Sequence, residues 1–342
     1  MKLLTITVPC YNSAAYMNKC IDKMLEVDHN DIEIIIVNDG SKDETLLIAK
    51  KYEEQYPDVV RVIDKENGGH GSGVNAGIAN ATGVYFRVCD SDDYLEPESL
   101  KKLLAVMKKA VEENNEPDVI FTNYVYDHAY DNTYRTNSLS RIMPKDRIFT
   151  WDEMKAWKVD EYTLMHSINY KTSIIRESKM VLPEHCFYVD EIYCYTPLFY
   201  CKKLYYMEIP LYWYFIGRPD QSVTLENMKK RYKMQLTVVE NMFGAYTYEQ
   251  LKTKPKKLRK YMIHTLRIMT TVATAYVYFD KGKQRRRDYR EFKKRIKASN
   301  PSLYKRIFHF GYTIISCNLP FFIARPAYAI GYRITAKTLK VG

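Results

Sequence analysis

The sequence lacks any regular pattern of cysteines. Its seven cysteines are odd in number and scattered, and no two of them form a C-x-x-C pair. Neither a disulfide framework nor a zinc site is therefore indicated, and a reducing cytosol fits this usage best. Internal repeats and low-complexity segments are also missing. With 46% hydrophobic and 27% charged residues over 342 positions, the chain is expected to be globular, with room for two domains.

Signals for secretion or for spanning a membrane are not found either. The N-terminal run MKLLTITVPCYN alternates like a strand and reaches Asn12 too early for a signal peptide. The apolar segment 303–334 is interrupted by residues such as His309, Pro320 and Arg325, which leaves no unbroken stretch long enough to cross a bilayer. We therefore expect a cytoplasmic protein.

Acidic and basic residues are divided unevenly along the chain. Residues 1–228 carry 25 Lys and Arg against 36 Asp and Glu, a net charge of −11, whereas residues 229–342 carry 27 against 5, or +22. The two regions are expected to have different electrostatic partners. Nucleic acid, a phosphorylated polymer or anionic lipid would each match the charge of the basic region.

The first 120 residues alternate between strand-like and helix-like segments. Apolar, β-rich runs occupy residues 3–8, 32–37, 59–63, 84–88 and 118–122. Helix-like stretches lie between them, at residues 14–27, 42–55, 72–81 and 98–113. Strand, helix and strand at this spacing predict an α/β fold with a mostly parallel sheet covered by helices. From about residue 225 onward, the sequence predicts long helices rich in Lys, Arg, Tyr and Met.

Polar residues directly follow four of the predicted strands. Asn12 follows the first strand, Asp39 the second, Asn67 and Gly68 the third, and Asp90 the fourth. Asn, Asp and Gly are ordinary turn formers, so one such loop would carry little weight. In open α/β sheets, however, ligands bind at the carboxyl ends of the strands, and polar residues at four successive ends favour a ligand site there.

Three carboxylates lie within four positions where the fourth strand ends, those of Asp90, Asp92 and Asp93. Like charges this close repel one another unless a cation lies among them. Mg²⁺ or Mn²⁺ with oxygen ligands would relieve the repulsion and keep sites open for a diphosphate. Helix capping competes for these residues, because a helix is expected to begin near Pro97. We assign the capping to Asp93 or Glu96 and the metal to Asp92.

A glycine-rich motif offers an alternative, dinucleotide-binding interpretation. Residues 71–76, GSGVNA, fit the pattern G-x-G-x-x-A and open a predicted helix after a strand. That fingerprint belongs in the first turn of its unit, and the first turn here is PCYNS, which has no glycine. Close packing of a helix on the sheet beside a nucleotide explains the small residues equally well, so a nicotinamide cofactor is given little weight.

Four motifs follow one another in the first part of the chain: VPCYN, VNDGSKDET, ENGGHGSGVNAGIANATG and VYFRVCDSDD. Their order and spacing resemble the N-terminal half of the family 2 glycosyltransferases, inverting enzymes of the GT-A type that use nucleotide-diphospho sugars. The resemblance implies a GT-A catalytic domain at 1–225, with a nucleotide-binding half at 1–122 and an acceptor half at 123–225. The basic helical region, 226–342, lies outside it.

The resemblance assigns roles to the strand-end residues. The family's nucleotide contacts map onto Pro9, Tyr11, Asn12, Asp39, Asn67, Gly68 and Asp90. Among these, Asp39 would accept the N3 hydrogen of uracil and Asp90 would contact the ribose. Asp92, the second acid of the D-x-D motif, would bind the metal, Mn²⁺ or Mg²⁺. Asn75 and Arg87 are placed near the nucleotide on the same grounds.

An inverting transfer also needs a general base that takes the proton of the acceptor hydroxyl. In the family this acid comes from an E-D-like motif well after the D-x-D, which matches LPEHCFYVDEIYC here. Asp190 would then be the base, with Glu191 as the alternative and His185 as a weaker one. Asp190 also begins a predicted helix, so simple capping competes with catalysis. An apolar, aromatic setting would raise the pKa of this carboxyl and suit it to act as a base.

The segment 211–224, LYWYFIGRPDQSVT, predicts an aromatic strand that leads into a polar loop. In related enzymes an Arg or Ser in this neighbourhood closes over the diphosphate, so the candidates are Arg218, Gln221 and Ser222. A turn exposed to solvent is the alternative. Aromatic residues that could stack on sugar rings are Tyr212, Trp213, Tyr214 and Phe187.

These inferences predict a metal-dependent inverting glycosyltransferase, a hexosyl- or N-acetylhexosaminyltransferase with a UDP-sugar donor. The expected acceptor is a glycan or a lipid-linked acceptor of a bacterial wall, capsule or teichoic-acid pathway. A sugar-phosphate nucleotidyltransferase is the alternative enzyme, but it would need a Gly-rich loop with Arg and Lys where this chain has TVPCYNSAAY.

A non-catalytic protein that binds anionic polymers would explain the basic region but would leave the acidic cluster without a purpose. No nucleic-acid-binding motif is found, so nucleic acid is not an expected partner. Two roles stay open for residues 226–342. One is peripheral docking at the inner face of the cell membrane, and the other is homo-oligomerisation.

Overall fold

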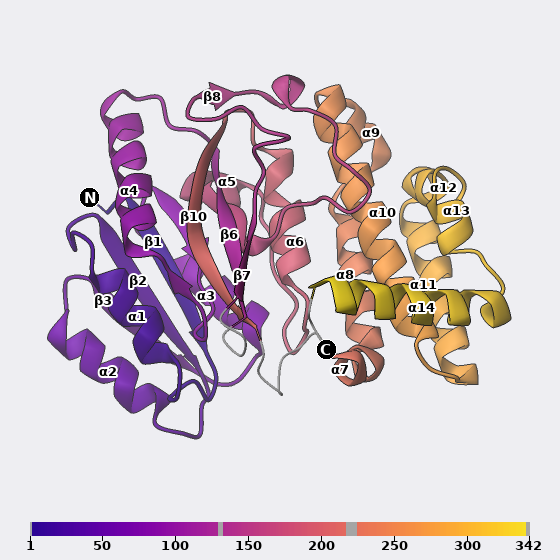
Figure 1. The fold of residues 1–342 in the computed structure, drawn as a ribbon, viewed down its shortest axis with the longest axis horizontal. Coiled ribbons are helices and arrows are strands. Elements are labelled where there is room, and N and C mark those ends of the chain that lie inside the picture. Colours follow the sequence, from indigo (N-terminus) through magenta and orange to yellow (C-terminus); the bar gives the residue numbers. More distant parts are fainter. Residues whose placement is uncertain (1, 129–132, 217–223, 340–342) are drawn as a thin grey trace. The chain divides into compact units, whose positions relative to one another are not determined.

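The computed structural model describes residues 2–128, 133–216 and 224–339. The chain divides into two compact units (Figure 1). The first unit comprises residues 1–156 and 163–216, and the second comprises 157–162 and 217–342. The second unit thus takes in the short segment 157–162, which no sequence pattern sets apart from its surroundings.

The first unit is built around one ten-stranded sheet. The strand order is β3-β2-β1-β4-β9-β6-β10-β5, with β7 paired to β6 and β8 paired to β10. The strands are β1 (Leu4–Cys10), β2 (Ile32–Asp39), β3 (Val60–Lys65), β4 (Tyr85–Val88), β5 (Tyr94–Leu95), β6 (Val119–His128), β7 (Thr133–Asn137), β8 (Ile148–Phe149), β9 (Ile168–Lys171) and β10 (Leu204–Ile216).

The helices of this unit are α1 (Met17–Leu25), α2 (Thr45–Gln55), α3 (His70–Asn80), α4 (Pro97–Glu112), α5 (Thr172–Glu177) and α6 (Asp190–Tyr195). Helices flank the sheet (Figure 1). Each strand and helix predicted within the first 122 residues is present, and the predicted α/β class with a mostly parallel sheet is confirmed.

Strand β1 shows how helices come to cover both faces of the sheet. Its side chains alternate in direction, and every second one joins an apolar core with α1: Leu4, Ile6, Val8 and Cys10. Thr7 and Pro9 face α3 instead, where Gly77 and Gly73 leave room for them. A Cβ atom at Gly73 would lie 3.0 Å from the Cβ atom of Pro9. Close packing of α3 therefore explains these small residues.

Strand β9 runs antiparallel to its neighbours β4 and β6. The six strands β1, β2, β3, β4, β6 and β10 are parallel to one another, so their carboxyl ends share one edge of the sheet. Because β9 runs the other way, its first residue lies at that same edge. The short 3₁₀ helix η2 (Met165–Ser167), which precedes β9, is thereby placed beside the strand-end loops.

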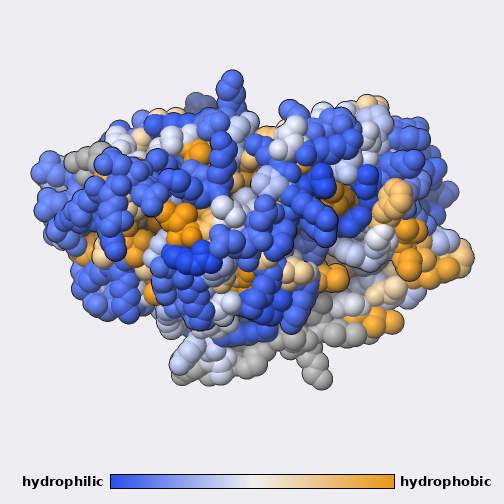
Figure 2. Space-filling model, turned by 90° about the horizontal axis from the view of Figure 1, so that it is seen from above, coloured by the Kyte–Doolittle hydropathy of each residue, from blue (hydrophilic) through white to orange (hydrophobic). Residues whose placement is uncertain are grey.

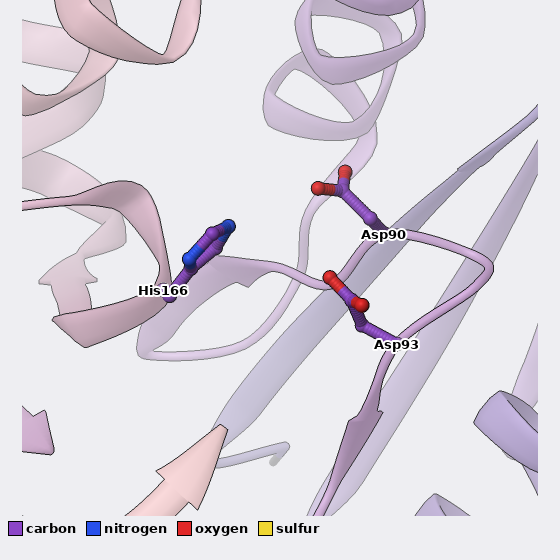
Figure 3. A group of neighbouring side chains, drawn as sticks. All are labelled: Asp90, Asp93 and His166. Carbon is purple, nitrogen blue, oxygen red and sulfur yellow. The ribbon is translucent and has the colours of Figure 1, made fainter. Parts of the chain in front are cut away.

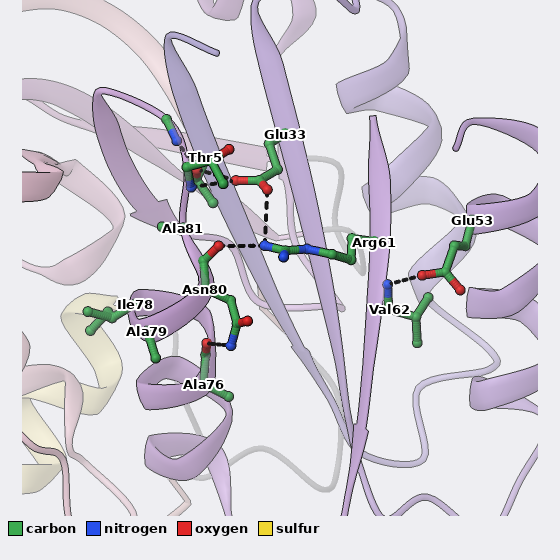
Figure 4. A network of polar contacts seen from close by, with 12 residues as sticks. Thr5, Glu33, Glu53, Arg61, Val62, Ala76, Ile78, Ala79, Asn80 and Ala81 are labelled. Carbon is green, nitrogen blue, oxygen red and sulfur yellow. Dashed lines mark hydrogen bonds and ion pairs between the residues drawn. The ribbon is translucent and has the colours of Figure 1, made fainter. Parts of the chain in front are cut away.

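A polar network fixes the opposite edge of the sheet (Figure 4). The Glu33 carboxylate accepts hydrogen bonds from Thr5 Oγ1 at 2.6 Å, from the Thr82 amide at 2.9 Å and from Arg61 Nη2 at 3.1 Å. Arg61 also donates to the carbonyl of Asn80. These contacts link the beginnings of β1, β2 and β3 to the end of α3. They therefore stabilise the arrangement of the strands whose other ends carry the site loops.

The second unit consists mainly of helices, which confirms the predicted helical C-terminal region. Its long helix α10 (Lys256–Tyr278) packs against α8, α11 and α14. The remaining helices are α7 (Leu225–Lys230), α8 (Tyr232–Ala245), α9 (Tyr248–Lys252), α11 (Lys283–Ser299), α12 (Pro301–Phe308), α13 (Thr313–Ser316) and α14 (Phe321–Leu339). Among the described residues, no helix is both long enough and apolar enough to cross a membrane.

Candidate active site

Asp39, at the end of β2, is buried and organises the loop that follows β3. Its Oδ1 atom accepts hydrogen bonds from Lys65 Nζ at 2.7 Å and from Gly68 N at 2.9 Å. Its Oδ2 atom accepts from Asn67 Nδ2 at 3.1 Å and from Gly69 N at 2.7 Å. The predicted nucleotide-binding residues Asp39, Asn67 and Gly68 therefore lie together. A uracil N3 hydrogen that bonded to Asp39 would have to replace one of these donors.

The loop after β1 leaves the ring of Tyr11 in solvent and is held by the loop after β2. Tyr11 is 52% exposed, whereas Pro9 is buried within β1. The backbone amide of Asn12 donates to Ser41 Oγ at 3.0 Å, and the Asn12 Oδ1 atom accepts from Lys42 N at 2.9 Å. Tyr11 is thus placed to stack on a planar ligand. Asn12 uses its side chain to shape the loop.

Three side chains converge at the carboxyl edge of the sheet: Asp90, Asp93 and His166 (Figure 3). Their ligand atoms all lie within 4.8 Å of one another. Two carboxylates and an imidazole could hold a divalent cation such as Mn²⁺. Asp92, to which the sequence analysis assigned the metal, is not a member of this group. Asp93 and His166 were not predicted as ligands.

Asp93 is wholly buried and faces strand β10. Its Oδ2 atom accepts a hydrogen bond from the Tyr212 hydroxyl at 2.6 Å, and its Oδ1 atom accepts from Phe215 N at 2.8 Å. Burial raises the pKa of Asp93 well above its usual value, and the charges of Asp92 and Asp90 raise it further. A cation among these carboxylates would oppose this effect, because it favours the ionised form.

Of the two residues expected to cap α4, only Glu96 does so. The Glu96 carboxylate accepts from the backbone amides of Glu98, at 3.0 Å, and Ser99, at 2.6 Å. Asp93 does not cap the helix, because its two oxygens are turned toward β10. The capping alternative therefore does not compete with a ligand role for Asp93.

His166 is fixed from two directions. Arg87, which is wholly buried in β4, donates through Nη2 to the His166 carbonyl at 3.0 Å and through Nη1 to Asn169 Oδ1 at 2.9 Å. The imidazole stacks on the Tyr212 ring with 4.4 Å between centroids. Arg87, expected near the nucleotide, thus positions His166.

The imidazole of His166 is suited to bind a metal. Burial lowers the pKa of His166 to about 4, although the charge of Asp90 opposes this shift. The ring is therefore neutral near pH 7, which is the form that binds metals. Among the residues that the structure describes, its buried Nδ1 atom has no hydrogen-bond partner.

His70 links the acidic loop to helix α3. Its Nε2 atom lies 2.8 Å from Asp90 Oδ1. Burial lowers the pKa of His70, but the charge of Asp90 and the hydrogen bond to it outweigh burial, and Asp190 and Asp92 add to the effect. The net result is a raised pKa, which favours the imidazolium form among these carboxylates. The sequence analysis predicted no role for His70. The signal that could have indicated one is its position as the first residue of α3, directly after the loop at the carboxyl end of β3.

Asp190 lies at the end of a segment, 182–190, whose first residue is hydrogen-bonded to helix α3. The Asn75 side chain accepts a hydrogen bond from Leu182 N at 3.0 Å and donates one to Leu182 O at 2.9 Å. Asn75 was expected to lie near the nucleotide, but the structure gives its amide these backbone partners instead. Asn75, in the glycine-rich motif, is therefore hydrogen-bonded to the beginning of the segment that ends at the predicted base.

The same segment has an unusual backbone. His185 and Tyr188 have φ angles of 48° and 67°, in the left-handed region that non-glycine residues seldom adopt. His185 N donates to Gly68 O at 2.6 Å. Gly69, with φ of 83°, lies so close that a Cβ atom there would be 3.1 Å from His185 N. Backbone strain of this kind persists only where surrounding contacts enforce it, and it is common at functional sites.

The environment of Asp190 raises its pKa. Burial is the largest cause, the charge of His70 lowers the pKa, and the charge of Asp90 raises it, with a net increase. A carboxyl with a raised pKa is better suited to act as a general base. Its neighbour Glu191 and the more exposed His185 lie on the same stretch of chain.

The remaining predicted site residues divide into two groups. Arg218, Gln221 and Ser222 lie outside the described residues. Of the aromatic side chains, Tyr212 is wholly buried, so the expectation that it stacks on a sugar is wrong. Trp213 stacks on Tyr94 with 5.7 Å between centroids, and Phe187 is 40% exposed.

Comparison with known proteins places the chain in a family. The model of glycosyl transferase family 2 matches residues 5–177, about half of the chain. The chain therefore belongs to glycosyl transferase family 2, as its motifs predict.

Curated relatives share this part of the chain. An uncharacterized glycosyltransferase of Rickettsia prowazekii is 32% identical over 173 residues, which cover 51% of this chain and 49% of the relative. The chondroitin synthase of Pasteurella multocida is 42% identical over 102 residues, or 30% of this chain and 10% of the synthase. The match thus spans about half the length of the first relative and less of the second.

Among solved structures, the crystal structure of S. aureus TarS 1–349 in complex with UDP-GlcNAc has a TM-score of 0.66 with this chain. The two are 17% identical, and the likeness covers 97% of this chain and 92% of that one. At this identity the likeness concerns the fold, and it confirms the predicted GT-A type architecture.

Proposed function

We propose that this chain is a metal-dependent, inverting glycosyltransferase that uses a UDP-sugar. The observation that carries the proposal is the group of Asp90, Asp93 and His166 at the carboxyl edge of the sheet, within electrostatic reach of Asp190. Membership in glycosyl transferase family 2 supports sugar transfer. The UDP-GlcNAc bound to TarS, which has the same fold, supports a UDP-linked donor.

The residues present fit a divalent cation. Asp90 and Asp93 supply carboxylates whose mutual repulsion a cation would relieve, and His166 supplies a neutral imidazole with a buried Nδ1 atom. These three side chains would hold Mn²⁺ or Mg²⁺, with Asp92 as a further acid beside them. When bound, the ion neutralises charge on the diphosphate leaving group.

The nucleoside would lie over the loops after β1, β2 and β3. Tyr11 would stack on the base, while Asn12 holds the loop and Pro9, in β1, supports it from the sheet. Asp39 would act mainly by fixing Asn67 and Gly68, since its carboxylate already accepts hydrogen bonds from both. Contacts from Arg218 and Ser222 to the diphosphate belong to the same proposal.

Asp190 would act as the general base. Its carboxylate would take the proton of the acceptor hydroxyl while the hydroxyl oxygen forms a bond to the anomeric carbon. The bond from that carbon to the diphosphate oxygen would break on the opposite side, so that UDP leaves and the configuration inverts. Asn75 would hold the base in place through Leu182.

The acceptor we propose is a growing glycan or a lipid-linked glycan of a bacterial surface polysaccharide. The relative named chondroitin synthase supports a polysaccharide product. A cytoplasmic location is part of the same proposal, and the seven cysteines, which are buried and form no disulfides, are consistent with it.

The proposal is tested by scanning UDP-sugars for hydrolysis and transfer in the presence of Mn²⁺. With the best donor, Asp190→Asn is expected to lower kcat by about 10²-fold or more, while the affinity for UDP stays nearly unchanged. Glu191→Gln is the matched control, because it removes the charge of the adjacent carboxylate on α6.

Two outcomes would contradict specific parts of the proposal. If Glu191→Gln is inactive and Asp190→Asn is active, the base is misassigned. If calorimetry gives the same affinity for UDP with Mn²⁺ and with EDTA, the metal role is misassigned. Release of pyrophosphate from a nucleoside triphosphate and a sugar phosphate would instead identify a nucleotidyltransferase.

A further inference from the structure

Helix α14 presents its apolar residues to solvent. Its inner side is packed, since Phe321 and Tyr328 lie against Tyr278 with 5.3 Å and 6.1 Å between ring centroids. The Tyr328 hydroxyl also donates to the Ser316 carbonyl at the end of α13. The orientation of the helix within the second unit is therefore fixed, and its outer side is a defined surface.

The outer side of α14 carries Phe322, Ile323 and Ile330, which are 75%, 44% and 57% exposed. Pro326 and Ala327 lie between them and are also exposed. These positions recur at the spacing of helical turns and share one face. A surface helix normally places polar residues on that face, so the pattern here is reversed.

Three further apolar side chains are exposed on α13 and in the turn before it. Phe310 is 47% exposed, Ile314 46% and Ile315 66%. We call the six residues the apolar surface: Phe310, Ile314, Ile315, Phe322, Ile323 and Ile330. Figure 2 shows apolar side chains, in orange, gathered on the exterior of the second unit. Large exposed apolar groups that cluster in this way mark an interaction site.

The stretch of chain that carries the apolar surface has charged residues of one sign only. Residues 292–342 contain ten Lys and Arg and no Asp or Glu. The Arg306 guanidinium lies 5.9 Å from the ring centroid of Phe310, a member of the apolar surface. A cationic group thus borders this exposed ring, and the stretch holds no acidic residue to neutralise its Lys and Arg side chains.

We propose that the apolar surface docks on an anionic lipid bilayer. Exposed Phe and Ile side chains would enter the boundary between headgroups and acyl chains, while the surrounding Lys and Arg bind lipid phosphates. Pro326 and the absence of a spanning helix among the described residues fit a helix that lies in the plane of the interface. Pairing of this face with the same face of a second copy is disfavoured, because it would bring like charges together.

Binding of the full-length chain to vesicles tests the proposal. Sedimentation is measured with equal parts of phosphatidylglycerol and phosphatidylcholine, and with phosphatidylcholine alone, at low and high salt. Binding is expected only to the anionic vesicles and is expected to weaken at high salt. The triple variant Ile315→Ser, Phe322→Ser, Ile330→Ser is expected to bind the anionic vesicles at least about tenfold more weakly.

The matched control is Leu47→Ser with Val181→Ser, which removes apolar side chains of the first unit that are 53% and 73% exposed. This control is expected to bind like the original chain. Thermal melting verifies that both variants fold. Equal vesicle binding by the triple variant and the control, or no binding at low salt, would overturn the proposal. A concentration-dependent oligomer that only the triple variant abolishes would identify a second copy as the occupant instead.

Discussion

The side-chain amide of Asn75 makes two hydrogen bonds to the backbone of Leu182, one to its amide at 3.0 Å and one to its carbonyl at 2.9 Å. The two residues are 107 positions apart in the chain. Through this pair, the helix that follows the third strand holds the segment that ends at Asp190.

Asn75→Ala is expected to lower kcat by about 10²-fold, because a small displacement of a catalytic group has effects of that size. The affinity for UDP is expected to stay unchanged, since the amide contacts the chain itself. Steady-state kinetics and calorimetry separate the two quantities. Asn80→Ala is the control, because that amide bonds only within its own helix, to Ala76 O. A parallel loss of affinity for UDP would instead support the sequence-based expectation that Asn75 contacts the nucleotide.

His166→Phe distinguishes the two assignments of the metal. Phe keeps an aromatic ring against Tyr212 but removes the imidazole nitrogen that could bind the ion. If His166 is a ligand, the gain in affinity for UDP on adding Mn²⁺ is expected to fall by at least about tenfold, while the affinity in EDTA is unchanged. Asp92→Asn is measured beside it. If only Asp92→Asn loses the gain in affinity for UDP on adding Mn²⁺, the metal ligand is Asp92, as the sequence analysis predicted.

As the pH is lowered, activity is expected to be lost at a higher pH than it would be if the base were an aspartate with its usual pKa. Asp190 must be ionised to accept a proton, and its pKa is raised above 3.8, so kcat/KM falls as pH decreases through the raised value. The charge of His70 lowers this pKa. His70→Gln is therefore expected to raise the pKa of Asp190 and move the acid limb of the pH profile to higher pH. His309→Gln, an exposed histidine of the second unit, is the control. An acid limb that stays in place in His70→Gln would count against Asp190 as the titrating base.

Gly77→Ala is expected to destabilise the protein by about 1–3 kcal/mol, because a side chain forced into a packed interface strains it. A Cβ atom at Gly77 would overlap the side chain of Thr7, which is wholly buried in β1. Gly244→Ala is the matched control in α8, where a Cβ atom meets nothing within 4 Å. It is expected to be neutral or to stabilise by up to about 1 kcal/mol. Urea unfolding measures both, and an undiminished free energy of unfolding in Gly77→Ala would contradict the close packing of α3 on β1.

Much of the first unit could be predicted from local patterns. The alternation of apolar strands and helices predicted β1 to β4 and the helices between them, because each element is specified by the periodicity of its own residues. The placement of Asp39 and Asp90 at one edge followed as well, since parallel strands end at the same side of their sheet. The net positive charge and the helical character of the C-terminal region were also predicted from its amino-acid composition.

His166 could not be predicted in this way. It reaches the acidic loop because the short strand β9 joins the sheet antiparallel, which places the residues before β9 at the carboxyl edge of the other strands. Periodicity indicates which face a side chain takes, but it carries no information about the direction in which a short strand pairs. The partners of Arg87 were hidden for the same reason, because Asn169 lies in β9 and His166 just before it. The partner of Asn75 was hidden because Leu182 lies in a loop 107 positions away.

The amino-acid sequence therefore determined β1 to β4, β6 and the helices between them, the family and the acids at the strand ends, because these depend on residues near one another in the chain. Tertiary structure alone decided which of those acids share a cluster, that Asp93 faces β10 while Glu96 caps α4, and that Asn75 holds the segment of Asp190. These outcomes depend on contacts between distant segments. The geometry of such contacts is set only when the whole sheet has formed and the helices have packed on it.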